Sequence, residues 1–341
     1  MRRAPQPSGR SVTIADVAKS AGVSPATVSR VLNGNPTVAP ELAARVREAV
    51  SSTRYVPNGV GRALRRQKSD MWAAIIPDVH NAFFTRVVEA FEGVANEDNY
   101  SVVLCNSRED PRREQDYIAT AIAHQVSGVL IAATSAQTKL FAFEDAGIPV
   151  VTIDRKIDGF MGDRVTVDGS MIGKLAADHM FSSGSRRPLI VSGPQHVTST
   201  VSREVGFHAR MGELGVDVPA NLVMRLDLRA NDAQEKIRAR IDSDDQVDGV
   251  FAVNGPLTSS AFLALRSCGK AVPDEVLLVG VDDDHWTTMV TPSVTVVAQP
   301  VEQIGRWAGQ LLLARSRLDS FDNAKITLEP TLVVRNSSSR G

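Results

Sequence analysis

The chain has 341 residues, a length typical of two or three domains, and its 43% hydrophobic and 23% charged content is ordinary for a globular protein. No apolar run approaches the roughly 18 residues of a membrane helix, and the basic N-terminus lacks the apolar core of a signal peptide. Together with only two distant cysteines, this predicts a cytoplasmic protein with no membrane partner.

The net charge of −1 is unevenly distributed along the chain. Residues 1–68 hold 12 lysines and arginines against three acidic residues, a net charge of +9. A basic head on an acidic body indicates a module that binds a polyanion. The alternative, a solvated basic tail, accounts for Arg2, Arg3 and Arg10 but not for the nine cations that follow within a patterned segment.

The first predicted helix begins after Thr13, which is followed three residues later by Asp16, the pattern of a capping box. Gly22 then allows the left-handed backbone of a tight turn. Ser24 and Pro25 predict the start of a second helix, as cap and first-turn proline. An apolar stripe indicates the buried faces of the two helices, with Ile14, Val17 and Ala18 in the first and Val28, Val31 and Leu32 in the second.

Two short helices joined by a glycine turn predict a helix-turn-helix, whose second helix enters the major groove of DNA. Its outward face carries short side chains and one arginine. Pro25 and Ala26 suit contact with base edges, Thr27 and Ser29 suit bases or phosphates, and Arg30 suits guanine or a phosphate. The alternative is an amphipathic helix of an unrelated small bundle. The DNA-binding candidates of this head are Thr13, Ser24, Pro25, Ala26, Thr27, Ser29, Arg30 and Asn33.

A third helix is expected from Pro40 to about Ser52, with Tyr55 closing the small core. "TIADVAKSAGVSPATVSRVLNG" followed by "YVPNGVGRAL" resembles the N-terminus of LacI/GalR-family transcription regulators. The resemblance implies that Pro57–Arg66 is a hinge helix that folds on operator DNA, with Leu64 as the minor-groove wedge and Asn58 and Arg62 as polar hinge positions. One departure is Ala39, where the family usually has a capping serine or threonine.

From Trp72 onward, short apolar runs alternate with helical stretches, which predicts parallel sheets covered on both faces. Ligands of such sheets bind beyond the carboxyl ends of the strands, and polar residues recur there. Loops after strands are polar in any case, so this pattern alone leaves the site open. The expected strand ends are Pro77-Asp78, Asn106-Ser107, Thr134, Asp154-Arg155, Asp168, Ser192-Gly193-Pro194, Asn254 and Asp282.

The family resemblance extends through the body. It implies an all-α helix-turn-helix head plus an α/β periplasmic-binding-protein-like body of two doubly wound parallel-sheet lobes, with a small-molecule effector between them. It also implies a homodimer that binds double-stranded, pseudo-palindromic operator DNA, most simply as a repressor. The effector-binding positions that it implies are Asn81, Phe83, Asp154, Arg203, Asn254, Asp282 and Gln299.

Two departures from the family bear on the effector. Asn254 is followed by Gly255-Pro256, where the family usually has an acid, and Val197 stands where purine-binding members have an arginine. The second departure counts against a nucleobase and leaves a sugar or other polyol as the favoured effector. An atypical ligand, a protein corepressor or no effector are the alternatives, and the sign of the response stays open.

An enzyme is the main competing class, but the chain has no H-E-x-x-H, G-x-S-x-G or paired cysteine motif. A solute-binding transport protein shares the body's architecture without a basic head. We therefore expect no catalytic residue, no cofactor and no metal site. The expected organisation is a tail at 1–10, the DNA-binding domain at 11–56, a hinge and linker at 57–68, a first lobe at about 69–167 and 298–326, a second lobe at about 168–297 and 327–336, and a tail at 337–341.

Overall fold

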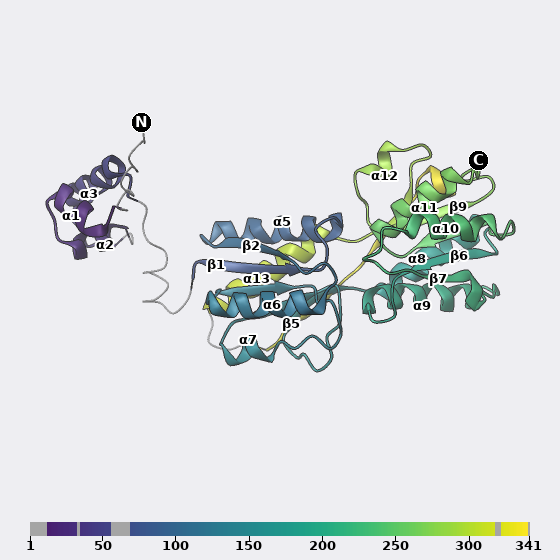
Figure 1. Ribbon diagram of the computed structural model, residues 1–341, viewed down its shortest axis with the longest axis horizontal. Helices are drawn as coiled ribbons and strands as arrows, with labels where there is room; N and C mark the ends of the chain where they lie inside the picture. The colour runs from purple at the N-terminus through teal and green to yellow at the C-terminus, as the bar shows by residue number, and fades with distance from the viewer. Residues whose placement is uncertain (1–11, 33–34, 56–68, 318–321, 340–341) are drawn as a thin grey trace, which may run out of the picture. The chain divides into compact units, whose positions relative to one another are not determined.

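A computed structural model of the protein describes residues 12–32, 35–55, 69–317 and 322–339. The chain divides into two compact units, Met1–Gln67 and Lys68–Gly341, which are taken in turn below (Figure 1). Among the described helices, none is long and apolar enough to cross a membrane.

The described residues of the first unit form a bundle of three helices, α1 (Ile14–Ala21), α2 (Pro25–Leu32) and α3 (Pro40–Thr53). The predicted capping box is confirmed, because the Thr13 hydroxyl accepts from the Asp16 amide and the Asp16 carboxylate accepts from the Thr13 amide at 2.8 Å. Gly22 ends α1 with φ +64°. The Arg45 guanidinium donates to the Ala21 carbonyl at 2.6 Å, and a side chain at Gly22 would collide with it.

The core of this bundle is the predicted apolar stripe. Val17, Val28 and Val46 are fully buried, one on each helix, and Tyr55 packs against the same cluster, as expected. The expected weakness at the start of α3 is also present, because Ala39 offers no side-chain cap. The sequence therefore anticipates the described part of this unit in detail.

The first lobe of the second unit is a sheet in the order β11-β5-β4-β3-β1-β2, all parallel. Its members in chain order are β1 (Met71–Ile76), α5 (Ala82–Glu97), β2 (Ser101–Asn106), α6 (Pro111–Ala123), β3 (Gly128–Ile131), α7 (Phe141–Asp145), β4 (Val150–Ile153), β5 (Asp163–Val167), α13 (Val301–Arg317) and β11 (Lys325–Leu328).

Alternate residues of β1 point to opposite faces of this sheet, and helices cover both faces. Trp72 packs with α5 and α13, where its ring lies 5.1 Å from that of Phe91. Ile75 packs on the other face with Ile118 of α6 and Phe143 of α7. Since both faces of β1 are buried against apolar side chains, its sequence is a continuous hydrophobic run.

The second lobe is a sheet in the order β12-β10-β9-β8-β6-β7, parallel except for β12, which runs antiparallel to β10. Its members are α8 (Gly169–Ser182), β6 (Pro188–Ser192), α9 (Thr198–Glu213), η1 (Ala220–Leu222), β7 (Val223–Arg225), α10 (Ala233–Asp242), β8 (Gly249–Ala252), α11 (Gly255–Ser267), β9 (Leu277–Val281), α12 (Trp286–Met289), β10 (Thr295–Ala298), β12 (Thr331–Val333) and η2 (Asn336–Ser338).

Helices α8 and α9 pack closely because glycines face each other across their contact. A Cβ atom at Gly206 would lie 2.3 Å from the Ser170 carbonyl oxygen, and one at Gly173 would lie 2.1 Å from the Arg203 carbonyl oxygen. Both obstacles are backbone atoms, which cannot move independently of their helix. The spacing of these two helices therefore depends on the absence of side chains at these positions.

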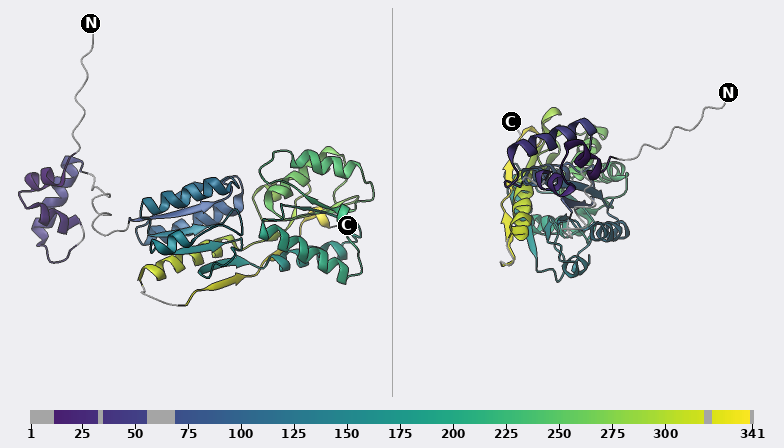
Figure 2. Two further views of the ribbon diagram at one scale, coloured as in Figure 1. Left: turned by 60° about the horizontal axis from the view of Figure 1, so that its bottom comes forward. Right: turned by 90° about the vertical axis from the view of Figure 1, so that its left-hand side faces the viewer.

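Three connections join the lobes (Figure 2). They lie between β5 and α8, between β10 and α13, and between β11 and β12. The third falls between Leu328 and Thr331, slightly later than the expected boundary at 326–327. Three short strands, β7, β11 and β12, were not anticipated as strands.

The expectation of a tail from residue 337 is wrong. Ser337 and Ser338 are fully buried, and the Ser337 hydroxyl donates to the Leu278 carbonyl at 2.6 Å. The Ser338 hydroxyl donates to that of Thr295 at 2.6 Å. These serines therefore complete the packing around β9 and β10. Of the two cysteines, Cys105 is buried and Cys268 is partly exposed.

Candidate functional site

The outward face of α2 carries the candidate DNA-reading residues. Pro25, Ala26 and Arg30 are exposed, whereas Thr27 and Ser29 are half-buried. The Ser24 hydroxyl accepts from the Thr27 amide at 3.1 Å, so Ser24 caps the helix. Thr13 caps α1, and its hydroxyl donates to the Asp16 carboxylate at 2.7 Å. Four of the predicted contacts, Asn33, Asn58, Arg62 and Leu64, lie outside the described residues, as does the predicted hinge.

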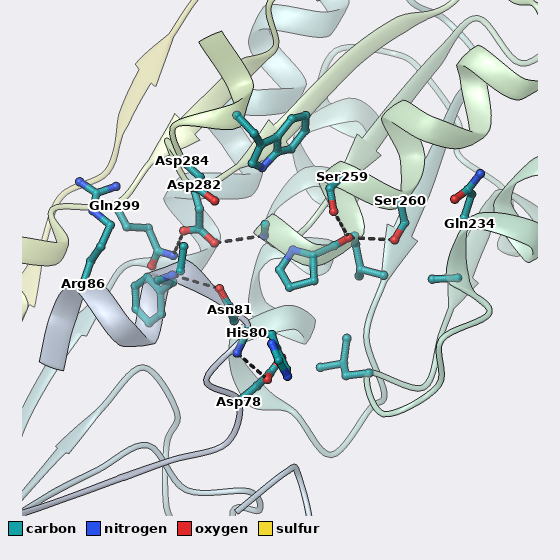
Figure 3. A pocket seen from close by; sticks show the side chains of 18 of the residues that line it. Asp78, His80, Asn81, Arg86, Gln234, Ser259, Ser260, Asp282, Asp284 and Gln299 are labelled. Carbon is teal, nitrogen blue, oxygen red and sulfur yellow. Dashed lines mark hydrogen bonds between the residues drawn. The ribbon is translucent and has the colours of Figure 1, made fainter. Parts of the chain in front are cut away.

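Between the two lobes lies a cavity of about 540 Å³, here called the interlobe cleft (Figure 3). Residues after β1 and at the start of α5 line one wall, and residues of α10, α11 and the β9–α12 loop line the other. A smaller cavity of about 50 Å³, the inner cavity, shares Asn81, Phe83 and Asp282 with it. The volume is in the range of small-molecule sites, about 300–1,000 Å³.

The structure brings all seven predicted effector positions to these two cavities. Asn81, Phe83, Asp282 and Gln299 line both, while Asp154, Arg203 and Asn254 line the inner one. They come from both lobes and from one connection, so they are far apart in the sequence. The carboxyl ends of β4, β8 and β9 supply three of them, as the strand-end argument predicts.

A chain of polar contacts links four of these residues. The Arg203 guanidinium donates to Asp154 at 3.3 Å, to the Gln299 amide oxygen at 3.1 Å and to the Val253 carbonyl at 2.9 Å. The Gln299 amide nitrogen in turn donates to Asp282 at 2.6 Å. Arg203 lies on α9 of the second lobe and Asp154 follows β4 of the first. The chain therefore connects the two lobes at the inner cavity.

Asp282 combines an unusual backbone conformation with a buried carboxyl group. Its backbone has φ +74°, a conformation that non-glycine residues rarely adopt, and Asp154 shares this feature with φ +58°. Burial raises the pKa of the Asp282 carboxyl above its ordinary value, while Arg203 and the bonds from Gln299 and the Gly255 amide oppose part of that effect. Such strain at two facing strand ends is typical of functional positions.

The Gly255-Pro256 departure has a clear local structure. Asn254 caps α11 by accepting from the Leu257 amide at 2.9 Å, and the Gly255 amide donates to Asp282 at 3.1 Å. Pro256 lies in the first turn of α11. Backbone N–H groups there have no partner within the helix, so a proline, which has no N–H, causes no loss of a hydrogen bond. The start of α11 is thus complete without an acidic side chain after Asn254.

The remaining two predicted positions belong to the first lobe. Asn81 caps α5 by accepting from the Phe83 amide at 3.1 Å. Phe83 is only 4% exposed and packs edge-on against Phe84, with ring centroids 5.0 Å apart. Phe83 therefore presents an apolar wall to the cavities rather than a freely exposed ring.

Some polar strand ends have a structural role instead. Thr134 donates through its amide to Glu114 at 2.6 Å, and Asp168 caps α8. The three consecutive aspartates after β9 also have different partners. Asp283 pairs with Arg335 at 2.6 Å, and Asp284 accepts from the His285 amide at 2.7 Å. Among the described residues, no group of three or more histidine, cysteine, aspartate or glutamate side chains could hold a metal ion.

Several lining residues escaped the sequence reasoning. Arg86 donates across the lobes to the Asp283 carbonyl at 2.8 Å and pairs with Glu302 at 2.8 Å. Trp286 adds an aromatic side chain to the cleft, and Ser199 donates to Asp154 at 3.0 Å. None of these carries a motif or lies directly after a strand, so only the tertiary structure reveals them. Further lining residues of this kind are Asn231, Gln234, Ser259 and Ser260.

Comparison with known proteins gives matches over both units. A sequence profile for "Bacterial regulatory proteins, lacI family" matches residues 13–58, and one for a "Periplasmic binding protein-like domain" matches residues 177–338. The chain is 33% identical to a ribose operon repressor of Halalkalibacterium halodurans over 329 residues, covering 96% of this chain and 98% of that protein. It is 31% identical to the transcriptional regulator PtxS of Pseudomonas aeruginosa, covering 97% of each.

Solved structures agree with this assignment of the fold. A transcriptional regulator CelR in complex with cellobiose is 27% identical, with a TM-score of 0.72 over 96% of this chain and 99% of that one. A lac repressor dimer bound to operator and the anti-inducer ONPF has a TM-score of 0.85 and 22% identity, over 96% and 99% of the two chains. The architecture of head and two-lobed body is therefore that of these regulators.

Proposed function

Since the chain belongs to the LacI family of bacterial regulatory proteins, we propose that it is a repressor whose affinity for a pseudo-palindromic operator changes when a sugar binds in the interlobe cleft. The family consists of transcriptional regulators, and the chain is a helix-turn-helix regulator with a ligand-binding domain. A regulator that binds chromosomal DNA acts in the cytoplasm.

The exposed face of α2 supports the proposal for DNA reading. Pro25 and Ala26 offer small apolar groups for base edges, and Arg30 is the cation of this helix, exposed at its last turn. Thr27 and Ser29 suit phosphates or bases. From the sequence alone, Thr13, Ser24, Asn33, Asn58 and Arg62 complete the proposed polar contacts, and Leu64 is the proposed wedge.

A sugar is the proposed effector because the cleft combines acidic, amide and apolar groups. Asp282 and Gln299 can exchange hydrogen bonds with hydroxyl groups, and Phe83 and Trp286 offer apolar surface to a sugar ring. Relatives add support, since one is named a ribose operon repressor and a solved neighbour contains cellobiose. Neither name identifies the effector of this chain.

The observation that carries the regulatory part is the contact chain from Asp154 through Arg203 and Gln299 to Asp282. A ligand that bonds to Asp282 or Gln299 competes with the bonds that position Arg203, and Arg203 is the residue that pairs with Asp154 of the other lobe. It therefore favours one relative arrangement of the lobes over another, which is the requirement for a ligand to shift a conformational equilibrium. The free energy of coupling between two such binding sites is commonly about 1–3 kcal/mol.

We further propose a homodimer, because one small helix-turn-helix buries too little surface for specific binding and pairs of heads match a two-fold operator. The test begins with selection of the operator from random duplex DNA by the full-length protein. Affinity for the selected site is then measured with and without a panel of mono- and disaccharides, sugar phosphates, polyols and nucleobases. Operator binding that no compound changes would contradict effector control, and failure to select any site would contradict DNA reading.

A further inference from the structure

The interlobe cleft extends beyond the predicted effector positions. Four of those positions line it, and three of the four, Asp282, Gln299 and Asn81, lie at one end, here called the inner subsite. Figure 3 shows Gln234 and Ser260 at the opposite end of the same pocket. Three uncharged polar residues on that side of the pocket define what we call the outer subsite, namely Gln234, Ser259 and Ser260.

The outer subsite has hydrogen-bonding capacity that the protein does not use. The Ser259 and Ser260 hydroxyls each donate to the Pro256 carbonyl at 2.9 Å, which leaves their oxygen lone pairs able to accept. The Gln234 amide nitrogen makes one long bond of 3.4 Å to Ser267. Hydroxyls and amides of this kind suit the hydroxyl groups of an uncharged ligand.

Gly255 leaves room beside the inner subsite. A Cβ atom there would lie 3.4 Å from the Asp282 carboxylate and 3.9 Å from the Asn81 side chain, so a longer side chain would crowd these two residues. Its backbone is not in the left-handed region, so the glycine is not required by the local conformation. The absence of a side chain at this position therefore matters for the shape of the cleft.

The charges around the cleft disfavour an anionic ligand. Five aspartates line it, Asp78, Asp227, Asp282, Asp283 and Asp284. Among the described lining residues the one arginine is Arg86, and its guanidinium already bonds to Glu302 and the Asp283 carbonyl. An anionic ligand would therefore meet several carboxylates and no free guanidinium.

From these observations we infer that the effector is an uncharged sugar of disaccharide length, with one ring in the inner subsite and the second in the outer subsite. This inference rests on the proposed function and specifies its ligand. It predicts that affinity depends on the second ring and on residues outside the seven predicted positions.

The test uses full-length protein and isothermal titration with cellobiose, maltose, lactose, sucrose and trehalose, each compared with glucose, galactose and fructose. At least one disaccharide should bind at least about tenfold more tightly than its constituent monosaccharides, since a second ring adds several hydrogen bonds. Gln234→Ala should weaken that disaccharide about 3- to 10-fold and leave monosaccharide binding unchanged. The matched control Gln246→Ala removes an exposed glutamine outside the cleft and should change neither.

Each outcome has a distinct meaning. Monosaccharides that bind as tightly as disaccharides, or a Gln234→Ala variant that binds the disaccharide like the unaltered protein, would overturn the two-subsite inference and leave a sugar effector intact. Binding of sugar phosphates or sugar acids in preference to every neutral sugar would overturn the argument from charge. Absence of binding by any sugar of either length would overturn both the inference and the sugar assignment of the proposed function.

Discussion

Arg203 of the second lobe and Asp154 of the first form a buried ion pair, with 3.3 Å between the guanidinium nitrogen and the carboxylate oxygen and side-chain exposures of 5% and 7%. Gln299, in a connection between the lobes, also accepts a bond from Arg203. One guanidinium thus contacts both lobes and a segment between them. In the regulator proposed above, Arg203 would therefore couple ligand binding to the arrangement of the lobes.

Asp154→Asn should lower the free energy of unfolding by about 3 kcal/mol, because the positive charge of Arg203 stays buried when its partner is neutralised. Chemical denaturation of the full-length protein measures this change. Asp242→Asn, which alters an exposed aspartate 4.0 Å from Arg238, is the matched control and should have little effect. Equal stability of Asp154→Asn and the unaltered protein would mean that the pair contributes no net stability.

Asp282→Asn should abolish the response of operator binding to the effector while leaving DNA binding by the ligand-free protein unchanged. The amide keeps the side-chain shape but removes the charged acceptor of the inner subsite. Operator affinity measured with and without the effector tests both halves of the prediction. A preserved response would place the ligand away from Asp282.

The same substitution should change how stability depends on pH. The folded-state pKa of Asp282 is raised by burial, so its contribution to stability is greatest below the unfolded-state pKa and is lost as pH rises through the folded-state value. Asparagine does not ionise, so the Asp282→Asn variant does not lose stability in this way as pH rises. The stability of Asp282→Asn relative to the unaltered protein should therefore increase as pH rises from about 4 toward 7. Thermal unfolding at several pH values tests this, and a difference independent of pH contradicts it.

Arg30→Ala should weaken binding to the operator by about tenfold or more, because each good side-chain contact to a base is commonly about 1–3 kcal/mol. The residue is exposed, so the melting temperature should hardly change. Arg238→Ala removes an exposed arginine of the body and serves as a control for the loss of positive charge. A large loss of stability in Arg30→Ala would mean that Arg30 has a structural role.

Gly206→Ala should destabilise the second unit by about 1–3 kcal/mol, because the new methyl group would meet the Ser170 backbone of α8 and force the helices apart. Gly212→Ala is a matched control on the same helix, since nothing lies within 4 Å of a Cβ atom there. That change should be neutral or slightly stabilising, as alanine favours helix over glycine. Similar effects of both substitutions on denaturant unfolding would rule out the packing explanation.

The head was predictable because its structure follows from local sequence. The Thr13–Asp16 capping box and the Ser24 cap each depend on residues within three positions of each other. In the body, β11 and β12 were missed because they are short edge strands of mixed polarity, whose pairing with β5 and β10 is set by tertiary structure. Ser337 looked like part of a polar tail because serine is usually exposed, and its buried bond to Leu278 is invisible in sequence.

The candidate site also has residues that the sequence predicts and residues that it does not. Asp154, Asn254 and Asp282 were among the polar strand ends that the sequence predicts, and the family resemblance singled them out as effector positions. Their bonds to Arg203 and Gln299 could be anticipated only in part, since the family resemblance implied the positions and not the contacts. Gln234 and Ser260 lie within helices without any special motif, and only the folded arrangement brings them to the cleft.

The last strands of the chain have a consequence for biosynthesis. The first lobe receives β11 (Lys325–Leu328) and the second receives β12 (Thr331–Val333), so each sheet is completed by one of the two strands that are synthesised after all the other described strands of the body. The sheet of the first lobe therefore cannot be complete until every described strand of the second lobe except β12 has been synthesised. A premature stop anywhere before Lys325 would therefore leave two open sheet edges instead of one intact lobe, and such edges are prone to aggregate.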